Sequence, residues 1–104
     1  MKVKHLKVAQ LGQLVKVLKG RDAGDVYVII GFVDDKFVLI ADGNRRKFDQ
    51  PKRKNLQHLE LQPMISGEVV QSLQECGFVT NGKLRFAVNA FTEFANSNAE
   101  EKGD

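Results

Sequence analysis

The chain has little cysteine and no long apolar run. Its one cysteine, Cys76, cannot form an internal disulfide bond, which favours a reducing compartment. No run of about 18 apolar residues occurs, and this excludes a membrane-spanning helix. The basic start, residues 1–7, is not followed by the apolar stretch that a secretory signal needs. We therefore expect a cytoplasmic protein with no membrane partner.

Residues typical of catalytic and metal sites are also scarce. The two histidines, His5 and His58, and the distant cysteine form no recognisable metal-binding set. Serine occurs only at positions 66, 72 and 97, outside any nucleophile-elbow or P-loop motif. The adjacent carboxylates Asp34 and Asp35 lie between two apolar runs and are typical of a hairpin turn. We predict no enzyme activity, no metal and no cofactor.

Charge is divided unevenly along the chain. Residues 1–58 contain 13 Lys and Arg against 6 Asp and Glu, whereas residues 59–104 contain 3 against 7. The net charge of +3 therefore conceals a basic first half and an acidic second half. Such a division within one small domain predicts a side that faces a polyanion.

The first 62 of the 104 residues contain short apolar runs separated by tight turns. The runs at 13–19, 26–33 and 37–41 are apolar on both faces, as strands covered on both sides would be. Gly24 and Gly43 lie in turns, where a positive φ is expected. We predict a returning strand at 45–48, a loop at 49–54 and a last short strand at 56–61. This spacing predicts a small β-barrel over residues 1–62.

Beyond Pro63 the apolar spacing becomes helical. Ser66 is a predicted N-cap and Gly77 a predicted stop for a first helix. A second helix is predicted after Thr80, with apolar residues three to four apart as far as residue 94. We expect two short helices within residues 63–95 that pack on the barrel, and a flexible acidic tail at 96–104.

Several side chains allow both a packing role and a binding role. Tyr27, Phe32 and Phe37 could stack on bases, but their place inside apolar runs favours the core. Cys76 falls on the apolar stripe of the first helix and is expected to be a small buried hydrophobe. Asp22 is expected to cap the turn that contains Gly24.

Two blocks of the sequence resemble a known family. The segment KGRDAG at residues 19–24, followed by an apolar strand, resembles the KOW motif. The segments VLIADG at 38–43, RRK at 45–47 and PKRKNLQHL at 51–59 are similar to KOW-domain ribosomal proteins of the L-fourteen-e kind. They also resemble short, free-standing KOW proteins of bacteria. The resemblance covers roughly half the chain. It implies a mainly β fold: a five-stranded SH3-like barrel, here covered by two short C-terminal α-helices.

The resemblance also implies which residues contact RNA. Gly24 matches the KOW glycine, and Arg46, Lys52, Lys54 and His58 match positions that the family directs toward RNA. Six cations lie between residues 45 and 54, on two sides of one predicted turn, so their charges should converge. The predicted RNA-binding residues are Lys19, Arg21, Arg45, Arg46, Lys47, Lys52, Arg53, Lys54 and His58, with Gly24 and Gly43 as structural turn residues.

The sequence thus predicts a non-enzymatic RNA-binding protein that acts in translation, on the ribosome or another structured RNA. Ribosomal proteins are further expected partners. The alternative is a protein-interaction module of the transcription or translation machinery, as KOW domains form in elongation factors of the NusG type. A large exposed apolar patch on the helices would favour that alternative.

Overall fold

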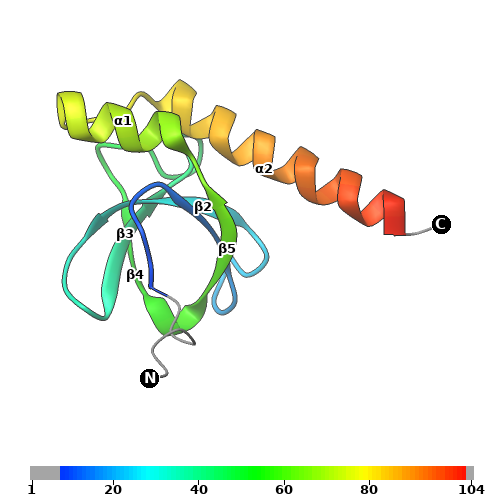
Figure 1. Cartoon of the computed structure of the whole chain (residues 1–104). Helices are drawn as coiled ribbons and strands as arrows, with labels where there is room; N and C mark the ends of the chain where they lie inside the picture. The colour runs from blue at the N-terminus through cyan, green and yellow to red at the C-terminus, as the bar shows by residue number, and fades with distance from the viewer. Residues whose placement is uncertain (1–7, 103–104) are drawn as a thin grey trace, which may run out of the picture.

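A computed structural model describes residues 8–102 as one five-stranded antiparallel sheet followed by two helices (Figure 1). The elements are β1 (Gln13–Val17), β2 (Val26–Phe32), β3 (Phe37–Ala41), β4 (Lys52–Asn55), the 3-10 helix η2 (Leu56–His58), β5 (Leu59–Ile65), α1 (Gly67–Cys76) and α2 (Asn81–Lys102). The strand order is β4-β3-β2-β1-β5, so β1, β2 and β3 form the centre of the sheet and β4 and β5 form its edges.

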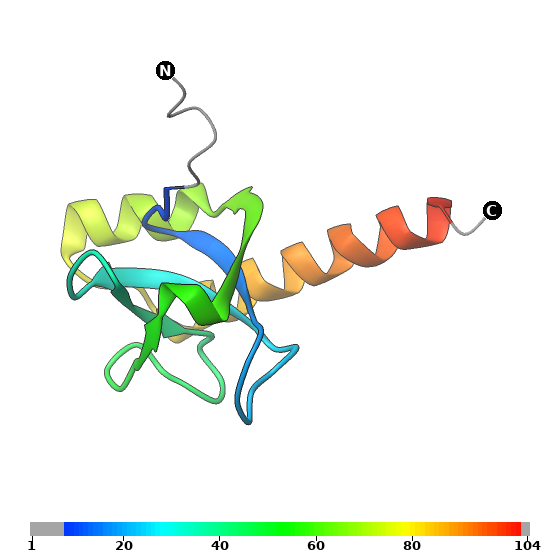
Figure 2. The same ribbon diagram turned by 90° about the horizontal axis from the view of Figure 1, so that it is seen from below.

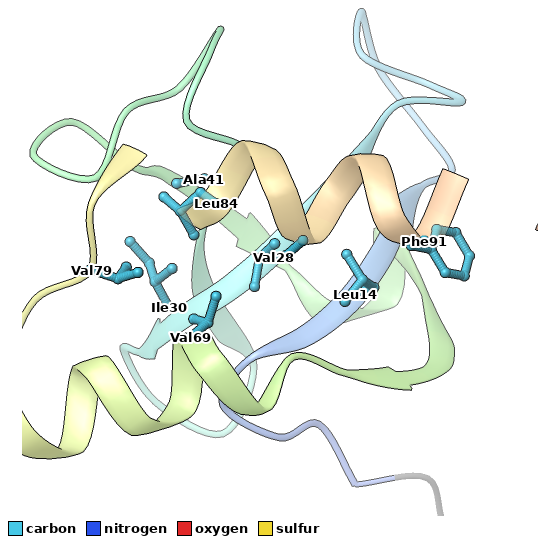
Figure 3. Packing of buried hydrophobic residues seen from close by; sticks show 9 residues of the cluster. Leu14, Val28, Ile30, Ala41, Val69, Val79, Leu84 and Phe91 are labelled. Atoms are coloured by element: carbon cyan, nitrogen blue, oxygen red, sulfur yellow. The ribbon is translucent and has the colours of Figure 1, made fainter. Parts of the chain in front are cut away.

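The sheet is apolar on both faces because each face packs against a different part of the chain. One face turns inward as the interior of the barrel, where Val15, Tyr27 and Ile40 are almost fully buried. The other face carries Leu14 and Val28 and is covered by the helices (Figure 3). The predicted class, a mainly β SH3-like barrel with C-terminal helices, is therefore confirmed.

The helical cover makes its own buried cluster with the sheet. α1 contributes Val69, the α1–α2 connection contributes Val79, and α2 contributes Leu84 and Phe91. Figure 3 shows these side chains in the layer between the helices and the sheet. At roughly 1.5–3 kcal/mol per buried large apolar side chain, this cluster contributes substantially to the stability of the domain.

A β-bulge explains why one predicted core residue is exposed. Ile29 pairs with Ile40, but the next paired residue on β2 is Gly31, so the register shifts at Ile30. Phe32 consequently faces the opposite side from Val28, at the end of its strand, and is half-exposed. The prediction that Phe32 packs in the core was wrong, whereas Tyr27 is buried and Phe37 is partly buried.

The predicted strand at 45–48 was also wrong, since residues 42–51 form a loop and the strand lies at Lys52–Asn55. The Asp42 carboxylate accepts hydrogen bonds from the backbone N–H groups of Asn44 and Arg46, each at 2.9 Å, and this holds the chain in a turn. Pro51 immediately precedes β4, an edge strand, where the missing N–H breaks no ladder. Residues 56–58 form η2 instead of the start of β5.

Both helices begin at the predicted caps. The Ser66 hydroxyl accepts from the N–H of Val69 at 3.2 Å, and the Thr80 hydroxyl accepts from the N–H of Lys83 at 3.2 Å. Gly77 ends α1 with φ of 79°.

The second helix is longer than predicted, at 22 residues, and its backbone stays helical through residues 96–102 of the expected tail. The flexibility of that segment stays a prediction. Figures 1 and 2 show α2 crossing the sheet and projecting beyond it.

Cys76 is exposed, which corrects its predicted burial. It is the last residue of α1, and every residue from Gln74 to Phe78 is exposed. The helix therefore ends beyond the packed cluster, and the apolar stripe is buried only in its first turns.

Candidate nucleic-acid interface

The β1–β2 loop, residues 18–25, lies against β4 and brings two groups of predicted cations together. The Lys52 ammonium is 2.9 Å from the Asp22 carboxylate of that loop. The Lys54 ammonium donates to the backbone carbonyl of Lys19 at 3.2 Å. Lys19 and Arg21 are exposed on the same loop. We call Lys19, Arg21, Lys52 and Lys54 the strand-β4 basic surface.

The Asp22 side chain connects this loop to β2 and β4. Its carboxylate accepts from Lys52 and, at 3.3 Å, from the hydroxyl of Tyr27. The hydrogen bond from Lys52 is the main reason that the pKa of Asp22 is lowered. Burial, followed by the nearby Asp22 charge, raises the pKa of Tyr27 to about 12, so the phenol stays protonated as a donor. Asp22 thus positions cations instead of only capping a turn.

The β3–β4 loop approaches the same β1–β2 loop through a second ion pair, between Arg45 and Asp25. The side chains of Arg46 and Lys47 on this loop are exposed, and the Arg46 guanidinium reaches the carbonyl of Gln50 at 3.5 Å. The β1–β2 loop is therefore contacted at Asp22 by β4 and at Asp25 by the β3–β4 loop. Predicted cations from three segments of the chain converge on it.

Arg53 and His58 lie apart from this convergence. Strand alternation directs Arg53 to the other face of β4, where its guanidinium lies 4.3 Å from the centre of the Phe37 ring. His58 lies in η2 and is partly buried, and its backbone carbonyl accepts from the N–H of Leu18 at 2.8 Å. The predicted cluster is thus split: Arg53 belongs to the β2–β3 end of the molecule, and His58 lies at the base of the loop.

The two turn glycines are used differently. Gly24 has φ of 94° and open space where a Cβ would point. Gly43 has φ of 79°, and a Cβ there would lie 2.2 Å from the carbonyl oxygen of Asn81. Gly43 is therefore also the point at which the β3–β4 loop touches the start of α2. The N–H of Phe48 donates to the Asn81 side chain at 2.8 Å and strengthens that contact.

Sequence reasoning missed the pairing roles of Asp22 and Asp25. Asp22 and Asp25 lie 20 or more positions from Lys52 and Arg45, so no local sequence pattern predicts these ion pairs. The only signal available was the alternation of Lys52, Arg53 and Lys54, which places the two lysines together if that segment is read as a strand. Among the side chains that the structure describes, residues 8–97, no group of three His, Cys, Asp or Glu could hold a metal ion.

Comparison with known proteins identifies relatives of one kind. No family model matches the chain. The large ribosomal subunit protein eL14 of Hyperthermus butylicus is 33% identical, over 67% of this chain and 80% of eL14. The eL14 of a Saccharolobus islandicus strain is 30% identical, over 76% of this chain and 91% of eL14. YbzG of Bacillus subtilis, named as a candidate ribosome-binding protein, is 39% identical, over 68% of this chain and 96% of YbzG.

The chain belongs to the eL14-like family. The resemblance to ribosomal proteins of the L-fourteen-e kind is therefore confirmed. The names of these relatives denote ribosomal or ribosome-binding proteins, and none denotes an enzyme. In the part of this eL14-like protein that the structure describes, neither helix has the length and apolar character needed to cross a bilayer.

Proposed function

We propose that this eL14-like protein binds structured RNA of the ribosome, in the cytoplasm, without catalysing a reaction. The observation that carries the proposal is the convergence of β4 and the β3–β4 loop on the β1–β2 loop through Lys52–Asp22 and Arg45–Asp25. It gathers exposed cations of the two loops beside the half-buried Lys52 and Lys54 of β4. The names of the relatives support the ribosome as the place where this surface acts.

Phosphate contacts account for the cations on these loops. Among residues 8–97, whose side chains the structure describes, the ion pairs involve Arg45 and Lys52, and no carboxylate of that range pairs with Arg21, Arg46 or Lys54. An unpaired surface cation releases bound counterions from the nucleic acid when it meets a phosphate, which drives association. The paired cations are held in place by Asp22 and Asp25 and set the shape of the surface.

Co-sedimentation with purified ribosomes and binding to isolated ribosomal RNA test the proposal. Arg21→Ala combined with Lys54→Ala removes two cations of the strand-β4 basic surface. It should weaken binding at least fivefold at constant salt. Lys36→Ala combined with Arg53→Ala removes the same charge from the β2–β3 end and should change binding less than twofold. Equal loss in the two double variants would show a nonspecific charge effect, and unchanged binding in the first would reject this surface.

Exposed phenylalanines on the helical part favour a second candidate function, docking on a ribosomal protein. The exposed fractions are 65% for Phe86 and 49% for Phe94, four residues either side of Ala90 on α2. These two rings form an exposed apolar stripe, which is typical of a surface that docks on another protein. Phe86→Ser with Phe94→Ser should then weaken ribosome binding while leaving binding to isolated RNA unchanged.

A further inference from the structure

A hollow lies where α2 leaves the barrel, beside both basic loops. It has a volume of about 410 Å³ and lies between α2, the base of the β1–β2 loop and the β3–β4 loop. Val26, Val88 and Phe91 line it with apolar atoms, and Phe91 is only 6% exposed. Figure 3 places Phe91 on α2 near Leu14 of β1. We call this hollow the α2 groove.

The charges around the α2 groove cancel. Lys16 and Arg45 contribute two positive charges, and Asp25 and Asp42 contribute two negative charges. A phosphate placed here would approach two carboxylates, so the groove is a poor phosphate site compared with the loops outside it. An uncharged ligand that carries both donors and acceptors would suit this lining.

A nucleobase has these properties. The carboxylates of Asp25 and Asp42 can accept from amino and imino groups, and the carboxamides of Asn44 and Asn96 can donate or accept. Arg45 offers a planar guanidinium at the rim, with its side chain 60% exposed and paired to Asp25. Bases of single-stranded RNA stack on such planes as well as on aromatic rings. The groove volume exceeds what one base needs.

We infer that the α2 groove receives one unpaired base of the bound RNA, stacked on Arg45 while its neighbouring phosphates contact Arg46 and Lys47. This rests on the proposed RNA binding and extends it from the phosphate backbone to a base. The preferred RNA would then carry an extruded or single-stranded nucleotide, since a base within a continuous duplex cannot enter the groove.

Filling the groove tests the inference. Ala95 lines the groove and is exposed on α2, so Ala95→Trp should occupy the space without disturbing the core. Ser97 is exposed on α2 outside the groove, and Ser97→Trp is the matched control. The probes are a hairpin RNA with a one-base bulge labelled with 2-aminopurine and the same hairpin without the bulge. Affinity and 2-aminopurine fluorescence are both measured.

We expect the parent protein to bind the bulged hairpin more tightly, with a fluorescence change at the bulged base. Ala95→Trp should weaken binding to the bulged hairpin about tenfold and binding to the unbulged hairpin less than twofold. Ser97→Trp should change neither. Arg45→Lys, which keeps the charge but removes the plane, should reproduce the selective loss.

The outcomes separate this inference from the RNA-binding proposal. Equal binding of both hairpins by the parent, or no selective loss in Ala95→Trp and Arg45→Lys, would overturn the α2 groove as a base site and leave phosphate binding in place. No binding of either hairpin or of ribosomal RNA by the parent would overturn both.

Discussion

At the scale of single residues, carboxylates decide what the basic loops can do. The Asp22 carboxylate, on the β1–β2 loop, accepts hydrogen bonds from the buried Tyr27 and from Lys52 of β4. The Asp25 carboxylate, on the same loop, forms an ion pair with Arg45 of the β3–β4 loop. A loop of this length without such anchors would lose more conformational entropy when it binds RNA. The two aspartates therefore reduce the number of free cations but hold the others in a defined arrangement.

The lowered pKa of Asp22 gives a pH-dependent test of this anchoring. Because the folded pKa lies below the ordinary value of 3.8, the stabilisation is present above that pH and is lost as pH falls through the folded pKa. Asp22→Asn should lower the free energy of unfolding at pH 7 by about 0.5–1 kcal/mol, because the pair is partly exposed to solvent.

Urea unfolding at pH 7 and near pH 2 measures this effect. The difference between the parent and Asp22→Asn should shrink at the lower pH, because the ion pair is lost as the carboxyl group of the folded protein becomes protonated. Asp49→Asn, on an exposed loop, serves as the control and should show little difference at either pH. A difference independent of pH would mean that Asp22 acts through packing and not through its charge.

At the scale of elements, local signals predicted what local interactions determine. Alternating β-branched residues indicated β1, β2 and β3, and Ser66, Gly77 and Thr80 marked the helix ends. These features depend on neighbours within four residues in the chain. The apolar outer face of the strands also predicted correctly that helices would cover the sheet.

The errors lie where distant contacts decide the structure. β4 has the sequence KRKN, which carries no apolar residue, and it becomes a strand by pairing with β3. The loop before it is shaped by Asp42 and by its contact with Asn81 on α2. The same holds for the candidate site. Its cations can be identified from composition, but which of them share a face depends on β4 being a strand. Arg53, which the sequence grouped with the other cations, lies on the opposite face of β4 for that reason, and its contact with RNA stays a prediction.

The covering role of α2 can be tested by comparing two of its apolar residues. Leu84 is fully buried between α2 and the sheet, whereas Phe86 is 65% exposed. Leu84→Ala should lower the free energy of unfolding by about 2–4 kcal/mol, since it removes buried apolar atoms and leaves a cavity. Phe86→Ala should change it by no more than about 0.5 kcal/mol.

Thermal and urea unfolding followed by circular dichroism would measure both. A small effect of Leu84→Ala would mean that α2 is docked too weakly to cover the sheet in solution. A large effect of Phe86→Ala in the isolated protein would instead indicate that its ring is buried, and this would weaken the case for a protein-docking stripe.

At the scale of the whole molecule, the division of charge follows the architecture. The basic first half of the sequence builds most of the barrel and both basic loops, and the acidic second half supplies β5 and the helices. α2 projects from the barrel (Figures 1 and 2), and its side chains as far as Asn96 line the α2 groove beside the loops. The basic residues of the barrel loops therefore form the side of the molecule that we expect to face a polyanion.

Salt dependence of RNA binding tests how many cations act at once. If about four contact phosphates, log K should fall against log salt with a slope near −3 for single-stranded RNA, and more steeply for duplex RNA. Replacing Arg21, Arg46 and Lys54 with alanine should flatten the slope by about 2, since each contact contributes about 0.7. Replacing both Asp22 and Lys52 with alanine removes one pair with no net charge. That variant should change the slope by less than about 0.5, although it loosens the loop.

Filter binding or fluorescence anisotropy at several salt concentrations gives each slope. Tight binding with the parent slope in the triple variant would place the phosphate contacts elsewhere on the protein. If the slope flattens as much in the Asp22 and Lys52 double variant as in the triple variant, the order of the loop sets the response to salt, and not the number of unpaired cations.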